Sequence, residues 1–271
     1  MDIRITEQKS NHRNLEHKSV EELTYLINQE DYKVSQVISG VLPQINKIIE
    51  EIVKKIKLGG RLFYVGAGSG GRLSVLDCIE LPTTFGIEKG IFNVILAGGV
   101  EHLAEALEEK EDDTAEAWLK LQESEVSSKD IVIGISASGT TPFVIEAIKK
   151  CRKNNITTAC IVSNTNTPIA RYADFPIEII TGPEFITGST RMKCGTAQKM
   201  VFDIISTTSM IQLGLIEDNS MVNVALINNK ITDRAIKMLM EKGHIENYSL
   251  AKKILLENGS VKKALQKINS I

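Results

Sequence analysis

The sequence is poor in the features that mark secreted, membrane-bound and metal-binding proteins. Among its 271 residues there are only four cysteines and four histidines, without the paired spacing of a metal site or a disulfide framework. No apolar run is long enough to span a bilayer, and the opening segment MDIRITEQKSNHRN lacks the apolar core of a signal peptide. We therefore expect a cytoplasmic protein with reduced thiols, no bound metal and no cofactor.

The sequence also lacks an excess of either charge. Lysine and arginine number 32 against 34 aspartates and glutamates, which gives a formal net charge of -2 at pH 7. Proteins that bind nucleic acid or anionic membranes over a broad face usually carry a basic excess, so we expect neither partner, although local cationic pockets remain compatible with this balance. A hydrophobic content of 42% is enough to bury one large core.

Two helices are predicted before the first strand. Ser19 begins SVEE, the Ser-x-x-Glu form of a capping box, and predicts a short helix through LTYLIN. A second helix, with a kink at Pro43 and an end at Gly59, is predicted from apolar residues that recur every three or four positions. This apolar stripe consists of Val34, Val37, Ile38, Val41, Ile45, Ile48, Ile49, Ile52, Val53 and Ile56.

Strand and helix patterns alternate in the next part of the chain. Strands are predicted in RLFYVG, FNVILAG, DIVIGIS, TTACIVS and FPIEII. Helices are predicted in RLSVLDCIE, PFVIEAIKKCRK and a long segment from about Arg191, and past Gly214 in NNKITDRAIKMLMEKG and SLAKKILLENG. This alternation predicts an α/β fold, a three-layer αβα sandwich with a mostly parallel sheet. The predicted parts are an N-terminal helical arm (residues 1–57), a core (58–214) and a C-terminal helical region (215–271).

The loop GAGSGGR follows the first predicted strand, with glycines at 66, 68 and 71 in GxGxxG spacing. That spacing by itself suggests a dinucleotide site. However, the second strand ends without the acid that would hold a ribose, and no Gly-Lys-Ser/Thr follows for a P-loop. We therefore expect a loop whose backbone, at Gly70, approaches a ligand closely, with Ser69 as a hydroxyl donor.

A second loop, SASGTTPF, follows the third predicted strand. It carries Ser136, Ser138, Thr140 and Thr141, with Pro142 at the expected first position of a helix. A helix cap needs only one hydroxyl. Four hydroxyls beside a helix N-terminus suit the several oxygens of a phosphate monoester.

A third segment, TGPEFITGSTRMKCGTAQKM at residues 181–200, places hydroxyls, glycines and cations before the long helix. One interpretation is a capped and solvated helix start. The other is an anion site, in which free backbone N–H groups and cations face a bound phosphate or carboxylate. The segment alone leaves both interpretations open.

Together these loops resemble the SIS domain, a phosphosugar-binding α/β module. GPEFITGSTRMKCGTAQK is similar to a signature shared by bacterial N-acetylmuramic acid 6-phosphate etherases and the glucokinase regulatory protein, and the resemblance to the etherases runs from about Ile5 to Arg234. Two departures are visible. Cys194 stands where a small residue such as alanine is expected, and Gly70 stands where GTSGR, the more usual form, has a hydroxyl.

The resemblance implies a lyase of amino sugar catabolism and peptidoglycan recycling. It implies cleavage of the D-lactyl ether of N-acetylmuramic acid 6-phosphate, by elimination and then addition of water, to N-acetylglucosamine 6-phosphate and D-lactate. Glu80 and Glu111 match the family's catalytic positions, and Glu108 is expected at the substrate. We expect Glu80 at the C-terminal end of a helix, because Pro82 follows, and Glu111 among acids that raise its pKa.

The resemblance also implies a homodimer with its site near the subunit boundary. Ser189, Thr190, Arg191 and Lys193 would then border the sugar, with the cations facing its lactyl carboxylate or its phosphate. Two other functions stay open: a non-catalytic phosphosugar sensor and an aldose-ketose phosphosugar isomerase. A SIS-type transcription regulator is disfavoured, because the N-terminal arm is short and not basic.

Overall fold

The computed structural model describes residues 4–105 and 107–268. Contacts divide these residues into two compact units. The first contains the chain up to Cys78 and Gly90–Ser206, and the second contains Ile79–Lys89 and the chain from Thr207 on. The three-part division made from the sequence stays a prediction. Within the described residues, no helix is long and apolar enough to cross a membrane.

One long helix, α1 (Val20–Lys57), replaces the two helices predicted before the first strand. The predicted capping box is confirmed, because the Ser19 side chain accepts from Glu22 N and the Glu22 side chain accepts from Ser19 N. Pro43 lies inside the helix, where it removes one backbone donor without ending the helix. The apolar stripe runs past it. Its buried members are Val34, Ile38, Ile45, Ile48, Ile49, Ile52 and Val53.

Five parallel strands form the sheet of the first unit, in the order β2-β1-β3-β4-β5. All five were predicted from the sequence. They are β1 (Leu62–Gly66), β2 (Phe92–Leu96), β3 (Ile131–Ile135), β4 (Thr157–Val162) and β5 (Phe175–Glu178). The predicted α/β fold is confirmed.

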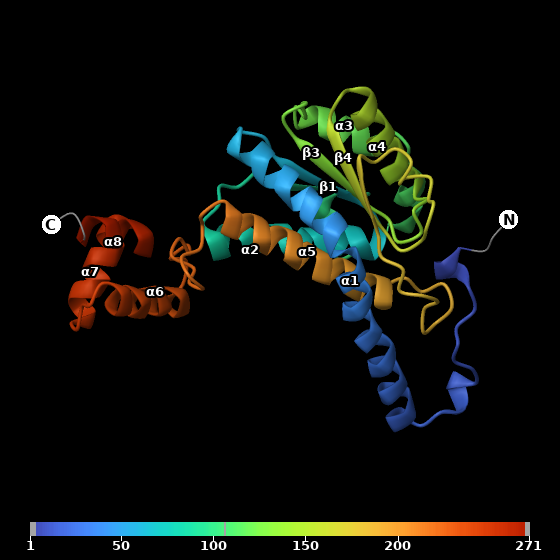
Figure 1. Ribbon diagram of the computed structural model, residues 1–271, viewed down its shortest axis with the longest axis horizontal. Helices are drawn as coiled ribbons and strands as arrows, with labels where there is room; N and C mark the ends of the chain where they lie inside the picture. Colours follow the sequence, from blue (N-terminus) through green and yellow to red (C-terminus); the bar gives the residue numbers. More distant parts are fainter. Residues whose placement is uncertain (1–3, 106, 269–271) are drawn as a thin grey trace. The chain divides into compact units, whose positions relative to one another are not determined.

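Helices cover both faces of the sheet (Figure 1). They are α2 (Gly68–Phe85), α3 (Glu116–Glu123), α4 (Pro142–Lys153) and α5 (Lys193–Gln212), together with α1. Side chains of a strand point alternately to its two faces. Phe63 and Val65 therefore pack with α3 and α4, whereas the Tyr64 ring lies 5.2 Å from the ring of Phe202 on α5. Burial of each such side chain stabilises the fold by about 1.5–3 kcal/mol.

Helix α2 does not end before Pro82, as the sequence suggested, but continues to Phe85. A proline inside a helix removes one hydrogen bond, and the other bonds of the turn can persist. Gly86 N donates to Pro82 O at 3.0 Å, which shows that the backbone around the proline keeps helical bonding. Glu80 is therefore inside the helix and not at its C-terminal end.

The second unit contains three further helices with an apolar cluster of their own. These are α6 (Asn229–Lys242), α7 (Tyr248–Asn258) and α8 (Val261–Ile268). The first two were predicted, and α8 was not. Asn228 and Asn247 cap α6 and α7, with side chains that accept from Ile231 N and Leu250 N.

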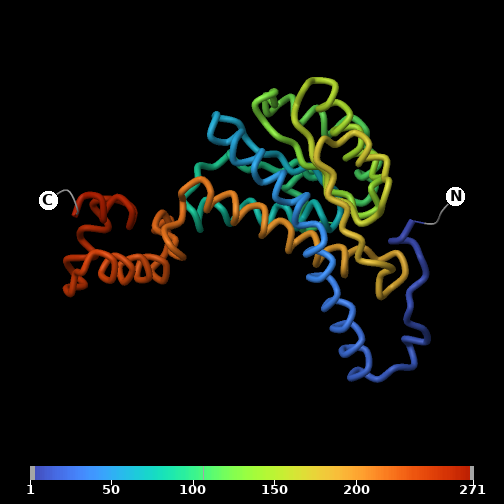
Figure 2. Tube along the Cα trace, in the orientation of Figure 1, coloured from blue at the N-terminus to red at the C-terminus, as the bar shows by residue number. Residues whose placement is uncertain are grey.

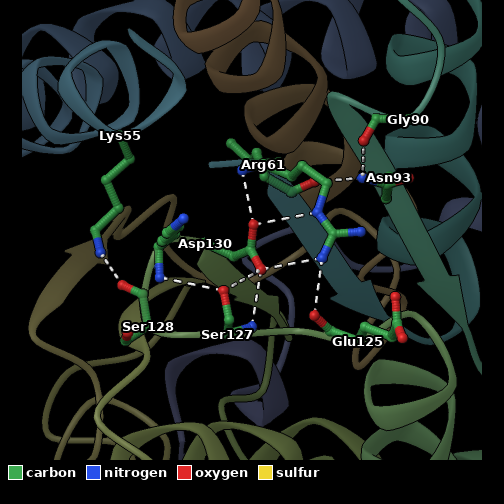
Figure 3. Close-up of polar contacts among 10 residues, drawn as sticks. Lys55, Arg61, Gly90, Asn93, Glu125, Ser127, Ser128 and Asp130 are labelled. Atoms are coloured by element: carbon green, nitrogen blue, oxygen red, sulfur yellow. Dashed lines mark hydrogen bonds and ion pairs between the residues drawn. The ribbon is translucent and has the colours of Figure 1, made fainter. Parts of the chain in front are cut away.

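An ion pair between the partly exposed Arg61 and the buried Asp130 joins the residues that precede β1 and β3 (Figure 3). The Asp130 carboxylate accepts from Arg61 N (2.8 Å), Arg61 Nε (3.2 Å) and Arg61 Nη2 (3.1 Å), and from Ser127 N (2.8 Å). Burial alone would raise the pKa of this carboxyl, but the hydrogen bonds from Arg61 and Ser127 outweigh it and hold the pKa below its ordinary value. The pair fixes the N-terminal ends of the two central strands.

We predict that Asp130→Ala lowers the free energy of unfolding by about 3–5 kcal/mol, because it leaves the Arg61 guanidinium and two backbone donors without their acceptor. The folded pKa of Asp130 is depressed, so its contribution in the wild type is present above the unfolded pKa of about 3.9 and is lost as the pH falls through the folded pKa. Urea unfolding at several pH values measures both effects. Glu123→Ala breaks an exposed pair with Lys120 and is the control, with an expected loss below about 1 kcal/mol. Equal losses in the two variants would contradict the prediction.

Candidate functional site

A polar cavity of about 210 Å³ opens at the C-terminal ends of β1 and β3. The chain passes from β1 to β2 on one side and then returns to place β3 on the other side of β1, so the direction of the strand order reverses between these two strands. Open α/β sheets bind ligands at such a switch point. The wall consists of Glu7, Ala67, Gly68, Ser69, Gly70, Glu111, Ile135, Ser136, Ala137, Ser138, Thr141, Gly188, Thr190 and Gln198.

The glycine loop forms one side of the cavity. Two of its residues, Gly70 and Gly71, lie so close to neighbouring atoms that a side chain would not fit. A Cβ on Gly71 would lie 2.8 Å from the carbonyl carbon of Gly66, so the first turn of α2 sits directly on the end of β1. A Cβ on Gly70 would lie 2.8 Å from Ile135 Cγ2 and 2.9 Å from Gln198 Oε1. The absent hydroxyl at Gly70 thus leaves room for the Gln198 amide, which also lines the cavity.

The hydroxyl loop forms the opposite side. Ser136 Oγ lies 2.9 Å from Thr141 Oγ1 and 3.3 Å from Ser138 Oγ, and it accepts from Gly139 N at 3.0 Å. Thr141 is the N-cap residue of α4, yet its side chain makes no cap hydrogen bond. The hydroxyls of this loop are therefore clustered beside a helix N-terminus without capping it, an arrangement that suits a bound anion.

Thr140 belongs to the same loop but is not in the cavity wall. Its hydroxyl donates to Ser138 Oγ at 3.0 Å and accepts from Arg4 Nη1 at 2.7 Å. Thr140 therefore does not line the cavity itself but hydrogen-bonds Ser138, which does.

Glu111 brings a carboxylate into the cavity from the 3-10 helix η4 (Glu108–Asp112). A Cβ on Gly68 would lie 2.7 Å from Glu111 Oε1, so only glycine at 68 leaves space for this carboxylate. Burial raises the pKa of Glu111, and the negative charge of Glu108 raises it further, while the Arg72 guanidinium opposes the shift. The sequence predicted the direction of this shift from the run of acids, but burial is its larger cause. Glu108 is exposed and outside the wall.

Residues 181–200, the third candidate segment, include the anion that lies at the start of α5. Glu184, fully buried, accepts from Lys193 N at 3.0 Å and from Cys194 N at 2.9 Å. The N–H groups that were a candidate site for a bound phosphate or carboxylate are therefore satisfied by the protein's own carboxylate. Cys194 is fully buried and fills the space behind this cap.

Lys193 forms a buried ion pair. Its Nζ lies 2.5 Å from Glu30 Oε2 on α1, and its side chain is only 3% exposed. Glu30 also accepts from Lys33 Nζ (2.6 Å) and contacts His12 Nε2 (3.1 Å). Burial opposes ionisation of Glu30, but these three partners lower its pKa to about 2. The Lys193 ammonium is thus already paired with Glu30, and its expected contact with the substrate stays a prediction.

The remaining predicted residues lie elsewhere. Ser189 is half-buried and Arg191 is exposed, and neither is in the cavity wall. Glu80 is exposed on α2 and belongs to the second unit, whereas the wall consists of residues of the first unit. The structure therefore brings together Ser69, Gly70, Glu111, Ser136, Ser138 and Thr141.

Three further polar residues lie in the wall: Thr190, which was expected to border the sugar, and Glu7 and Gln198, which were not predicted as site residues. Thr190 and Gln198 lie in the segment that carries the etherase resemblance, and Glu7 lies in TEQKSN near the start of the chain. The resemblance covered all three, but the residue types of Glu7 and Gln198 alone carried no signal for a site.

The cavity combines an anion-binding loop with one carboxylate that takes up a proton more readily than an ordinary glutamate. Among the described residues, no group of three histidine, cysteine, aspartate or glutamate side chains is placed to hold a metal ion. The arrangement is suited to hold a small phosphorylated molecule and to transfer a proton to or from it.

Two family models match the chain. The SIS domain matches residues 114–207, and the glucokinase regulatory protein N-terminal SIS domain matches residues 44–152. The phosphoheptose isomerase of Neisseria gonorrhoeae has a similar structure, with a TM-score of 0.54 and 15% sequence identity over 70% of this chain and 98% of that chain. The likeness shows that the predicted SIS fold is correct.

Relatives of known name match almost the whole chain. The N-acetylmuramic acid 6-phosphate etherase of Bacteroides thetaiotaomicron is 48% identical over 264 residues, which are 97% of this chain and 95% of the relative. That of Christiangramia forsetii is 49% identical over 260 residues, which are 96% of this chain and 94% of the relative.

We predict that the pKa of Glu111 falls in a Glu108→Gln variant, because a neighbouring negative charge is removed while the burial of Glu111 is kept. NMR titration of the ¹³C-labelled side-chain carboxyl, assigned with Glu111→Gln, measures this pKa. Glu109→Gln removes an equal charge from the same short helix and is the control, because Glu109 does not contribute to the shift. An unchanged pKa in Glu108→Gln, or an equal fall in the control, would show that the assigned cause is incorrect.

Proposed function

Because this chain belongs to the N-acetylmuramic acid 6-phosphate etherase family, we infer that it cleaves the D-lactyl ether of N-acetylmuramic acid 6-phosphate. The products are N-acetylglucosamine 6-phosphate and D-lactate, and the enzyme is a carbon–oxygen lyase of amino sugar metabolism. The observation that carries this reaction is a half-buried carboxylate with a raised pKa, Glu111, in the same cavity as the hydroxyl loop.

The chemistry requires proton transfer at the sugar. In the ring-opened form, the C2 proton lies beside the C1 aldehyde and is acidic enough for a base to remove. The electron pair left at C2 forms a C2–C3 double bond as the C3–O bond to lactate breaks, and an acid protonates the departing oxygen. Water then adds at C3 while a proton returns to C2, so the net change is hydrolysis.

We propose Glu111 as the group that removes the C2 proton. Burial and Glu108 raise its pKa, which moves the glutamate toward the pH at which an enzyme base works best. A raised pKa means that the carboxylate is a stronger base than an ordinary glutamate, so it accepts a proton more readily. Glu80 is proposed as the second acid–base group on the strength of the family match alone.

The substrate phosphate is proposed to bind at the hydroxyl loop. Ser136, Ser138 and Thr141 are clustered within hydrogen-bond reach of one another and line the cavity at the start of α4. A phosphate placed there would leave the sugar directed toward Glu111 and the glycine loop. Ser189 and Arg191 stay proposed contacts of the lactyl group, since they flank Thr190 of the wall.

The partners and location are also part of the proposal. Tyr25, Tyr32 and Leu42 are exposed on α1, and a second copy of the chain would cover this apolar surface, so we propose a homodimer. The near balance of charges supports a protein that does not bind nucleic acid. All four cysteines are free and buried, which supports a reducing, cytoplasmic environment.

We expect Glu111→Gln to stay folded and to bind the sugar phosphate, but to release D-lactate about 10²- to 10⁴-fold more slowly. Glu80→Gln is expected to show a loss of the same order. In deuterium oxide, the wild-type product should carry deuterium at C2, because the proton removed there is replaced from solvent. Coupled assay of D-lactate and mass spectrometry of the product measure the two effects.

The control is Glu109→Gln, an exposed neighbour in the same short helix. Turnover by Glu111→Gln equal to that of the control would exclude Glu111 as the base. A product with only protium at C2, formed at the normal rate, would favour direct displacement at C3 over elimination.

Ser136→Ala is expected to weaken binding of N-acetylglucosamine 6-phosphate about tenfold or more, since a hydrogen bond to a charged group is lost. Binding of N-acetylglucosamine, which has no phosphate, should be weak and equal in variant and wild type. Calorimetric titration measures both affinities. Ser39→Ala, at an exposed hydroxyl on α1, is the matched control with no expected change. The phosphate assignment fails if Ser136→Ala weakens both sugars alike.

A further inference from the structure

The N-terminal arm, residues 4–18, runs back from the start of α1 to the loops of the site (Figure 2). Two buried residues of the arm, Thr6 and Ser10, hold it in place by hydrogen bonds. Thr6 N donates to Asn164 Oδ1 at 3.2 Å, and Asn164 Nδ2 donates to Thr6 Oγ1 at 3.0 Å. Ser10 Oγ donates to Phe185 O at 2.7 Å. The arm is therefore held on both sides of Glu7.

Asn164, the partner of Thr6, also holds the hydroxyl loop. Asn164 Nδ2 donates to Ala137 O at 3.0 Å as well as to Thr6, so one amide joins the arm to the loop. Arg4 adds a second link, because its Nη1 donates to Thr140 Oγ1 at 2.7 Å. The position of the arm is thus set by the same residues that shape the proposed phosphate site.

Glu7 lies between the fastened residues and is part of the cavity wall. Its Oε2 would lie 3.5 Å from a Cβ on Gly188, which places the carboxylate beside the loop that carries Thr190. Glu7 is exposed to solvent, and within residues 4–105 and 107–268 its carboxylate has no hydrogen-bond or ion-pair partner. The fold therefore holds an acceptor at the cavity that the protein itself does not use.

We propose that Glu7 binds the sugar through its O–H and N–H groups. A carboxylate accepts hydrogen bonds from hydroxyl and amide donors, and it repels a phosphate or a lactyl carboxylate. Glu7 therefore faces the sugar ring and its acetamide, with the phosphate at the hydroxyl loop. The choice of sugar rests on the proposed function.

The test compares two ligands, N-acetylglucosamine 6-phosphate and inorganic phosphate, by calorimetric titration of the full chain. Glu7→Ala should bind the sugar phosphate about tenfold or more weakly, since hydrogen bonds to a charged acceptor are lost. Its affinity for inorganic phosphate should be unchanged or higher, because a negative charge near the site is removed. Glu7→Gln keeps the size of the side chain and one acceptor oxygen, so its affinity for the sugar phosphate should be intermediate.

Glu16→Ala is the matched control, because Glu16 is an exposed glutamate of the same arm outside the cavity wall. Equal affinity of the wild type and Glu7→Ala for the sugar phosphate would overturn the inference. A parallel fall in affinity for inorganic phosphate would also overturn it, since it would show damage to the hydroxyl loop. A failure of the proposed function can be told apart from a failure of this inference, because in that case the wild type itself would release no D-lactate.

Discussion

The ion pair between Lys193 and Glu30 ties together the three chain segments that the site depends on. Lys193 begins α5, Glu30 lies on α1, and His12 of the arm contacts the same carboxylate. Two charges removed from water cost several kcal/mol each, and the cost is offset only when geometry and further hydrogen bonds are good. Glu30 meets this condition with three nitrogen partners. The arm, α1 and the loop before α5 therefore keep one relative position.

A sequence can show where strands and helix caps lie, because these depend on neighbouring residues. The five strands and the Ser19 capping box were predicted correctly for this reason. One proline was misjudged, because Pro82 does not end its helix. Pro43 and Pro82 reduce local helix stability, but tertiary packing of an apolar stripe outweighs the loss of one hydrogen bond.

Partners that are distant in sequence account for what was missed at the site. Lys193 and Glu30 are 163 residues apart, so no local pattern indicated that a lysine in this cation-rich motif would pair with α1. Glu184 is closer, but its role as the acceptor for α5 depends on a fold of the loop that its residue type does not specify. The glycine and hydroxyl loops were easier to interpret, since each lies directly between a strand and a helix.

The attachment of the arm has a consequence for how the protein is made. Thr6 is synthesised early, but its partner Asn164 follows 158 residues later, and the partner of Ser10 later still. Contacts over such a separation form late, because the entropy of closing the intervening chain must first be overcome. A nascent chain can thus fold much of its sheet before its first residues find their place. The part of the cavity wall at Glu7 is therefore completed only after the chain around Asn164 and Phe185 is in place.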